Sequence, residues 1–181
     1  MPDANCSTSA ADGLEKGDHA NLCKSVHQPA GQTGHLQHGG RCFYWSLTLT
    51  GVLLQKGYRA LIQAGSMSWP IMPPGEDDGH SPTHFSYEWS PWREESRAAL
   101  RFGLLPEIHV WVGLPDQNEL LDFTTKFLPE QAANERLAWR TAPPPDFLWC
   151  SPSELPAGVI YKPDLAAIGF ILHRIRKTKH R

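Results

Sequence analysis

The clearest pattern of hydrophobic positions along the chain lies between residues 42 and 57. Apolar residues recur there at the three- and four-residue spacing of one helix face: Trp45, Leu49, Val52 and Leu53. Gly57 ends the pattern, and glycine is a favoured residue just after a helix. Gly39 and Gly40 allow the backbone a sharp turn before the pattern begins. The pattern therefore predicts a buried helix that starts at Cys42 and ends at Gly57.

Shorter patterns predict strands and further helices after this one. Apolar or alternating stretches predict strands at residues 58–64, 83–89, 108–112, 120–124 and 147–150. Helical spacing predicts helices at residues 94–102 and 127–140, the second with Pro129 in its first turn, and residues 164–172 are expected to form a helix or a strand. Prolines and polar residues predict loop around the second strand, over residues 66–91, and a turn at residues 113–118.

The remaining sequence adds two flanking segments to one domain. Residues 1–34 are rich in small and polar residues without a sustained period, and we expect a disordered or loosely attached lead segment. Residues 173–181 hold five of the seventeen Lys and Arg residues, and we expect a solvated, frayed basic tail. Residues 35–172 then form a single domain, as the length of 181 residues suggests.

Composition and charge narrow the classes of partner. The chain is 40% hydrophobic and 20% charged with a formal net charge of −2, so neither nucleic acid nor a membrane surface is an expected partner. No apolar run approaches the roughly 18 residues of a membrane span. The four cysteines form no CxxC pair and no signal-peptide pattern precedes them, so we expect reduced thiols and a cytoplasmic protein.

Cys42 is the first candidate for chemistry, because the predicted helix begins there. The unpaired N–H groups and the dipole of a helix start favour a thiolate, and with a cationic partner they lower a cysteine pKa from about 8.5 to roughly 3.5–7.5. The alternative is an inert buried cysteine, since free cysteine is among the most buried residue types. His35 and His38 precede it, and the three side chains could be zinc ligands, although a fourth ligand is not evident.

His109 and Asp122 form the second candidate. In the predicted strand at residues 108–112, His109 shares a face with Trp111, and a hairpin with the strand at residues 120–124 would place Asp122 beside it. A carboxylate fixes the tautomer and the orientation of a histidine that acts as a general base. The alternative is a core histidine with a satisfied hydrogen bond and an aspartate at a strand end.

Cys42, His109 and Asp122 together supply the thiolate, imidazole and orienting group of nucleophilic catalysis. The stretches that contain them resemble the transglutaminase-like branch of the papain-like cysteine fold: GRCFYWS at residues 40–46, HVWV at 109–112 and LDFT at 121–124. Members of this branch have a Gly-x-Cys-aromatic helix start, a His-x-Trp strand and an Asp near the end of the next strand. The resemblance spans about residues 39–125 and implies an α+β fold in which the nucleophile helix packs on an antiparallel sheet.

The resemblance also implies a function. It implies cysteine-dependent acyl transfer or amide hydrolysis, of protease, amidase or transglutaminase type, on a peptide or protein amide through a thioester. The backbone N–H of Cys42 would stabilise the oxyanion, with Gln37 or Trp45 as candidates for a second donor. Neither a cofactor nor a metal is implied. The alternative is a catalytically inactive fold that acts as a protein-binding module, with Cys42 packed in the core.

Overall fold

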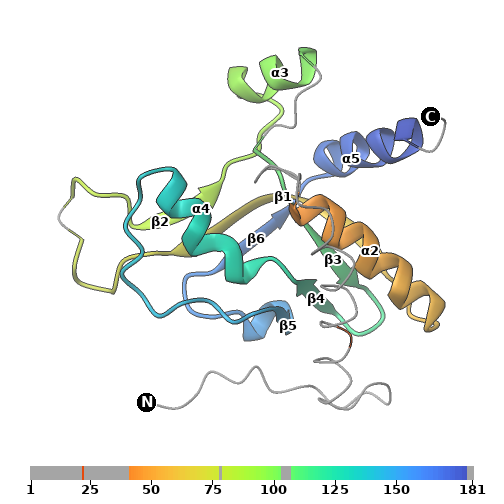
Figure 1. The fold of residues 1–181 in the computed structure, drawn as a ribbon, viewed down its shortest axis with the longest axis horizontal. Coiled ribbons are helices and arrows are strands. Elements are labelled where there is room, and N and C mark those ends of the chain that lie inside the picture. Colours follow the sequence, from red (N-terminus) through yellow and green to blue (C-terminus); the bar gives the residue numbers. More distant parts are fainter. Residues whose placement is uncertain (1–21, 23–40, 78, 103–106, 179–181) are drawn as a thin grey trace.

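The computed structural model describes residues 22, 41–77, 79–102 and 107–178. This part of the chain forms an α+β fold with four α-helices and a six-stranded antiparallel sheet (Figure 1). The helices are α2 (Arg41–Gln55), α3 (Glu94–Arg101), α4 (Leu128–Asn134) and α5 (Leu165–Thr178). The strands are β1 (Leu61–Pro70), β2 (His84–Tyr87), β3 (His109–Leu114), β4 (Glu119–Asp122), β5 (Leu148–Cys150) and β6 (Ile160–Pro163). The predicted α+β class and antiparallel sheet are confirmed.

β1 is the strand around which the sheet is built. The strand order is β2-β1-β3-β4-β5, and β6 also pairs with β1. Gly65 of β1 pairs with both His109 of β3 and Pro163 of β6. Two residues further on, Met67 pairs with Tyr87 of β2 and Tyr161 of β6. Because directly paired residues, and residues two apart in a strand, lie on the same face, this register gathers His109 and both tyrosines on one face of the sheet.

β1 is longer than its sequence suggested. The strand predicted at 58–64 is present from Leu61, but the prediction of loop from residue 66 is wrong, because β1 continues to Pro70. Burial alternates in the added part, with two buried and three half-buried side chains: Met67 and Trp69, then Ser66, Ser68 and Pro70. The serines favour turns in general, but here they occupy the less buried face of a strand.

The end of α2 follows the prediction closely. Gly57 has a φ of 88°, in the left-handed region that glycine adopts most easily. The backbone N–H of Tyr58 bonds to the carbonyl oxygen of Leu53 at 3.0 Å, and the N–H of Gly57 bonds to that of Leu54 at 3.0 Å. These two bonds form a Schellman motif, which satisfies carbonyl groups at the helix end. The helix is described from Arg41 onwards, one residue before the predicted start.

Helices pack on both faces of the sheet. On one face, α2 shares a core with β3 and β4 that includes Leu49, Leu53, Val112 and Leu121. On the same face, α5 packs beside Cys42 through Ala167 and Ile171. On the other face, α4 shares a core with Met67 and Trp111 through Leu128 and Ala132. Val112 and Trp111 are neighbours in β3 and therefore point to opposite faces.

The second half of the chain departs from the predictions in several places. The turn after β3 is shorter than the predicted 113–118, because β3 continues to Leu114. The helix predicted at 127–140 ends at Asn134, and Arg136 just after it has a φ of 63°. Pro129 is in the first turn of α4, as predicted. The sequence did not indicate β6, which carries a mixture of exposed and half-buried residues instead of a clear alternation.

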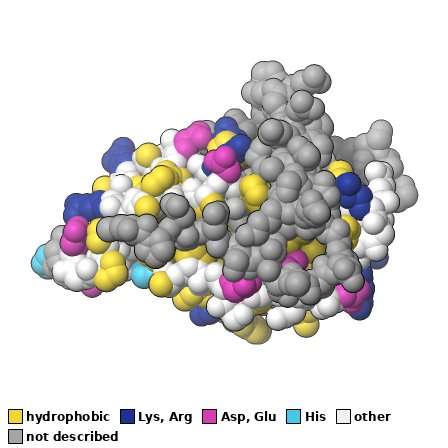
Figure 2. All heavy atoms as spheres, turned by 90° about the horizontal axis from the view of Figure 1, so that it is seen from below, with side chains coloured by type: hydrophobic (Ala, Val, Ile, Leu, Met, Phe, Trp, Pro, Cys, Tyr) yellow, Lys and Arg dark blue, Asp and Glu magenta, His cyan; other side chains and the backbone are white. Residues whose placement is uncertain are grey.

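The ends of the chain lie partly outside the described residues. Of the predicted lead segment only Leu22 is described, and it is buried in the core beside α2. α5 extends to Thr178, well into the predicted basic tail. Figure 2 shows side chains of both charges scattered among apolar ones on one face of the molecule, with neither sign prevailing. Among the described helices, none is long and apolar enough to cross a membrane.

Candidate active site

Cys42 lies in the first turn of α2, which is docked against the start of β3. One turn later, the hydroxyl of Ser46 donates a hydrogen bond to the carbonyl oxygen of Val110 at 2.9 Å. The Cys42 thiol points to the carbonyl oxygen of Ile108, 4.0 Å from its sulfur. Carbonyl groups two residues apart in a strand face the same edge, so both side chains reach one edge of β3. The edge is open there because β4 pairs with β3 only at Val112–Leu114.

The side chains packed around Cys42 are mostly apolar, and its polar neighbours are the backbone of α2, the carbonyl oxygen of Ile108 and the ring of His109. The residue is 5% exposed and belongs to a core cluster with Ala64, Ile108, Val110 and Ile171. The N–H groups in the first turn of a helix have no acceptor within the helix, and the helix dipole adds positive potential there. The location therefore favours negative charge beside an otherwise apolar wall.

His109 and Asp122 form a buried pair on the face of the sheet opposite the core of α2. His109 Nε2 lies 2.6 Å from Asp122 Oδ2, and each side chain is 1% exposed. The pairing of Gly113 with Leu120 places both side chains on the same face, by the alternation along each strand. The structure thus contains the predicted hairpin and brings its histidine and aspartate together.

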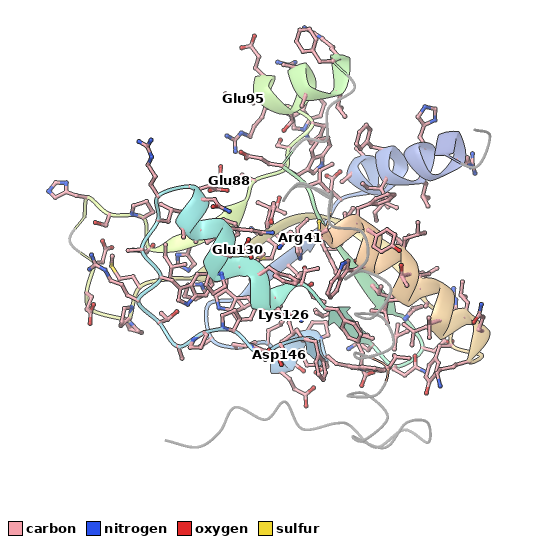
Figure 3. All side chains as sticks on the ribbon, in the orientation of Figure 1. Arg41, Glu88, Glu95, Lys126, Glu130 and Asp146 are labelled. Atoms are coloured by element: carbon pink, nitrogen blue, oxygen red, sulfur yellow. The ribbon has the colours of Figure 1, made fainter. Side chains whose placement is uncertain are left out.

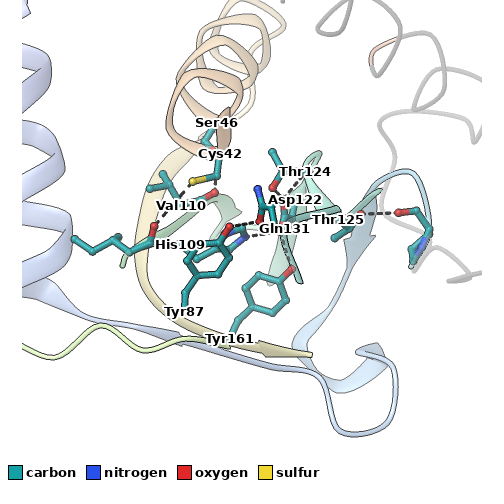
Figure 4. A network of polar contacts seen from close by, with 12 residues as sticks. Cys42, Ser46, Tyr87, His109, Val110, Asp122, Thr124, Thr125, Gln131 and Tyr161 are labelled. Carbon is teal, nitrogen blue, oxygen red and sulfur yellow. Dashed lines mark hydrogen bonds and ion pairs between the residues drawn. The ribbon is translucent and has the colours of Figure 1, made fainter. Parts of the chain in front are cut away.

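Four hydrogen bonds hold the carboxylate of Asp122 (Figure 4). Oδ2 accepts from His109 and from the hydroxyl of Tyr161 at 2.7 Å. Oδ1 accepts from the backbone N–H of Thr124 at 2.8 Å and from the Thr124 hydroxyl at 2.6 Å. Burial alone would raise the pKa of Asp122, but the charge of His109 and these hydrogen bonds outweigh it and lower the pKa. Asp122 is therefore ionised at neutral pH.

The charge of the imidazole follows from the same neighbours. Burial alone would lower the pKa of His109, but the Asp122 carboxylate and the Cys42 sulfur raise it from 6.5 to about 10. The other ring nitrogen, Nδ1, is buried and has no hydrogen-bond partner among the described residues. Figure 4 shows Cys42 beside this ring, at the start of α2. His109 is thus held by Asp122 at Nε2, and its Nδ1 is left to exchange a proton with another group.

Aromatic rings enclose His109. The Tyr87 ring lies 4.9 Å from the imidazole at an interplanar angle of 31°, and the rings of Trp111 and Tyr161 lie at 6.1 and 5.9 Å. Burial, together with nearby negative charge, raises the pKa of both tyrosines, which therefore remain neutral phenols. The rings exclude water from the imidazole and limit its motion.

Two hollows border the tyrosines. One of about 350 Å³ reaches Tyr87 and is otherwise lined by residues of β1, β2, β6 and the segment after β2, among them Ser66, Ser86, Trp89 and Lys162. The other, of about 280 Å³, reaches Tyr161 and Trp111 and has mostly apolar walls, among them Leu120, Leu155 and Pro163. Ligand sites are commonly concave and largely apolar with a few polar groups, so both hollows offer room for a substrate near the site.

Of the other predicted site residues, only Trp45 lies within the described part of the chain. Gln37, one candidate for an oxyanion donor, lies outside the described residues, and so do the possible zinc ligands His35 and His38. Trp45, the other donor candidate, is buried in the core next to Leu49, and its ring meets Phe127 edge-on at 5.4 Å. Among the described residues, no group of three His, Cys, Asp or Glu side chains could hold a metal ion.

Sequence reasoning missed three residues of the site. Tyr87, Gln131 and Tyr161 come from β2, α4 and β6, and no local pattern connects them with His109. Thr124 is different, because an Asp followed two residues later by a Thr is part of the resemblance. Cys150 is buried in β5.

Comparisons with known proteins find a similar fold but no relative with a stated function. No protein-family model and no curated protein matches the chain. A solved structure from structural genomics is similar in fold, with a TM-score of 0.57 and 13% sequence identity. The match covers 95% of this chain and 78% of the other, whose description states no activity. At this identity the similarity establishes a shared fold alone.

Proposed function

We propose that this protein is a cysteine-dependent acyl-transfer or amide-hydrolysing enzyme, with Cys42 as nucleophile, His109 as general acid and base, and Asp122 as its orienting group. One observation carries the proposal. A carboxylate holds a buried imidazole at Nε2, its Nδ1 has no partner among the described residues, and the nearby Cys42 sulfur helps to raise the pKa of the ring. A nucleophile, a base and a group that orients the base are what covalent catalysis requires.

The residues would divide the reaction between them. Before substrate binds, the proton of the Cys42 thiol is already held on His109 Nδ1, so the pair is a thiolate and an imidazolium. The thiolate attacks the substrate carbonyl to form a tetrahedral oxyanion. The imidazolium then protonates the leaving amine, and the thioester that remains is released by water or by an acceptor amine. The backbone N–H of Cys42, in the first turn of α2, serves as one oxyanion donor. No cofactor takes part in this scheme.

We further propose that the domain belongs to the transglutaminase-like branch of the papain-like fold and acts on a peptide or protein amide. The nucleophile helix packed on an antiparallel sheet supports this assignment. So does the order of the three functional residues: a helix start, a strand and the end of the strand paired with it.

Alkylation of Cys42 by iodoacetamide tests the proposal. We expect wild-type Cys42 to be labelled quickly even in mildly acidic buffer, because a neighbouring imidazolium keeps the sulfur in its reactive anionic form. In His109→Ala, labelling should be slow in acid and should rise only as an ordinary thiol ionises, near pH 8.5. Peptide mass spectrometry measures each cysteine separately, and the buried Cys150 of the same molecule is the internal control.

The structure also favours a second candidate, a protein-binding module with an inert cysteine. Cys42 is only 5% exposed, and its thiol already points to a backbone carbonyl group. Under this alternative, Cys42 and Cys150 would be labelled equally slowly, and His109→Ala would change neither rate. That result would refute the proposed enzyme.

A further inference from the structure

Gln131 of α4 is a buried residue whose side-chain amide uses only its oxygen in a hydrogen bond. The residue is 8% exposed, and its Oε1 accepts a hydrogen bond from the Tyr87 hydroxyl. Neither N–H of the amide meets an acceptor in the part of the chain that the structure describes. The amide nitrogen is not among the fully buried polar atoms that lack a partner, so a substrate oxygen can reach it from outside.

α4 is fixed close to the first turn of α2, so the position of this amide is well determined. Arg41 Nη1, at the start of α2, lies 3.3 Å from Glu130 Oε2, next to Gln131 in the chain (Figure 3). The Arg41 guanidinium also lies over the Phe127 ring, 5.0 Å from its centroid. These contacts connect the helix that carries Cys42 with the helix that carries Gln131.

Tyr87 holds the amide in one orientation. Its ring packs against His109 at an interplanar angle of 31°, and its hydroxyl donates to Gln131 Oε1. With the oxygen engaged by Tyr87, the nitrogen must point elsewhere. Figure 4 shows Gln131 beside His109, with its amide nitrogen turned toward the first turn of α2, where Cys42 lies.

We propose that the Gln131 amide is the second oxyanion donor, partner to the backbone N–H of Cys42. When the Cys42 thiolate bonds to the carbonyl carbon, the π electrons of the C=O bond move onto its oxygen, and a Gln131 N–H donates to that oxygen. The oxyanion then reforms the carbonyl and expels the leaving group, which leaves a thioester on Cys42. Gln131 thus takes the place for which the sequence offered only Gln37 and Trp45.

The inference rests on the proposed function, and two reagents test the two separately. Iodoacetamide alkylates the thiolate by direct displacement and creates no oxyanion on the attacked carbon. p-Nitrophenyl acetate acylates the thiolate through a tetrahedral oxyanion. In Gln131→Leu, which removes both donors at similar size, we expect acylation of Cys42 to slow by about 10²–10³-fold while alkylation is unchanged.

Two further variants sharpen the test. Gln117→Leu is the matched control, because Gln117 lies in the turn at the far end of the β3–β4 hairpin, and both rates should equal those of the wild type. Tyr87→Phe leaves the Gln131 amide in place but unoriented, and acylation should fall by a smaller factor than in Gln131→Leu.

Different results would contradict the donor role of Gln131 and the proposed function. Unchanged acylation in Gln131→Leu would overturn the donor role and leave the proposed function intact. An equal fall of acylation and alkylation would also overturn it, since Gln131 would then act by supporting the thiolate. If neither reagent modifies Cys42 in the wild type, the proposed function fails and this inference fails with it.

Discussion

At the scale of single residues, the carboxylate of Asp122 organises the site. A buried charge is costly unless it is paired and fully hydrogen-bonded. Asp122 meets this requirement with His109 and Tyr161 on one oxygen and two donors from Thr124 on the other. Its full set of bonds is what allows an ionised carboxylate to fix a charged imidazole inside the protein.

Part of this residue-level arrangement could be predicted. His109 and Asp122 lie 13 residues apart on a hairpin, so alternation along two adjacent strands was enough to pair them. Tyr161 could not be found in this way. It reaches Asp122 from 39 residues further along the chain, and the strand that carries it has no clear hydrophobic alternation.

Removing the Tyr161 hydroxyl tests the role of this hydrogen bond. Tyr161→Phe should lower the free energy of unfolding by about 1.5–3 kcal/mol at neutral pH, since the bond goes to a charged group. The pKa of Asp122 is lower in the folded protein than its usual 3.8, so its stabilising contribution is complete above that pH and declines as the pH falls below it. The loss in Tyr161→Phe should therefore shrink in acid.

Urea unfolding over a range of pH measures both effects. Tyr44→Phe is the control, because Tyr44 is partly buried against the core and its hydroxyl has no hydrogen-bond partner among the described residues. A loss in Tyr161→Phe that equals the control, or that does not change with pH, would show that the hydroxyl does not stabilise the carboxylate.

At the scale of elements, Gly65 lets β1 pair closely with a strand on each edge beside the site. It pairs with β3 through His109 and with β6 through Pro163. A Cβ at Gly65 would overlap the carbonyl oxygen of Lys162 and lie 3.0 Å from the backbone nitrogen of Asp164. Both atoms belong to backbone, which cannot rotate away as a side chain could. The close approach of β6, and with it the position of Tyr161, depends on this glycine.

Gly65→Ala is therefore expected to push β6 away from β1. We expect a loss of about 1–3 kcal/mol, typical of overpacking, and a lower melting temperature. Gly51→Ala is the matched control, since Gly51 is exposed on α2 with open space around it. There, alanine should stabilise the helix by roughly 0.5–1 kcal/mol. Equal effects of the two substitutions on thermal unfolding would contradict this account.

Some helix and strand boundaries could be predicted from the sequence and others could not. The end of α2 was found because helical spacing and a terminal glycine agree. The second half of β1 was missed because its serines and its proline favour turns when taken alone. β6 was missed because its residues show no clear alternation of buried and exposed positions. Tertiary pairing overrides that preference, since β1 is covered by strands along both edges.

At the scale of the whole molecule, the candidate site lies where α2, α4 and the sheet meet. α2 packs on one face of the sheet and α4 on the other, and Arg41 connects their ends through Glu130. The order of Cys42, His109 and Asp122 was visible in the sequence because each lies in a short local pattern. The tyrosines and Gln131 become neighbours only through long-range packing, which periodicity cannot reveal.

The most direct test of the central claim, a charged His109 beside Cys42, is an ¹⁵N NMR titration of the histidine rings. The chain has nine histidines, and comparison with His109→Gln assigns the signal of interest. We predict that both ring nitrogens of His109 remain protonated at neutral pH and lose a proton only near pH 10, with an earlier transition in Cys42→Ala. A His109 ring that is already neutral at pH 7 in the wild type would contradict the account.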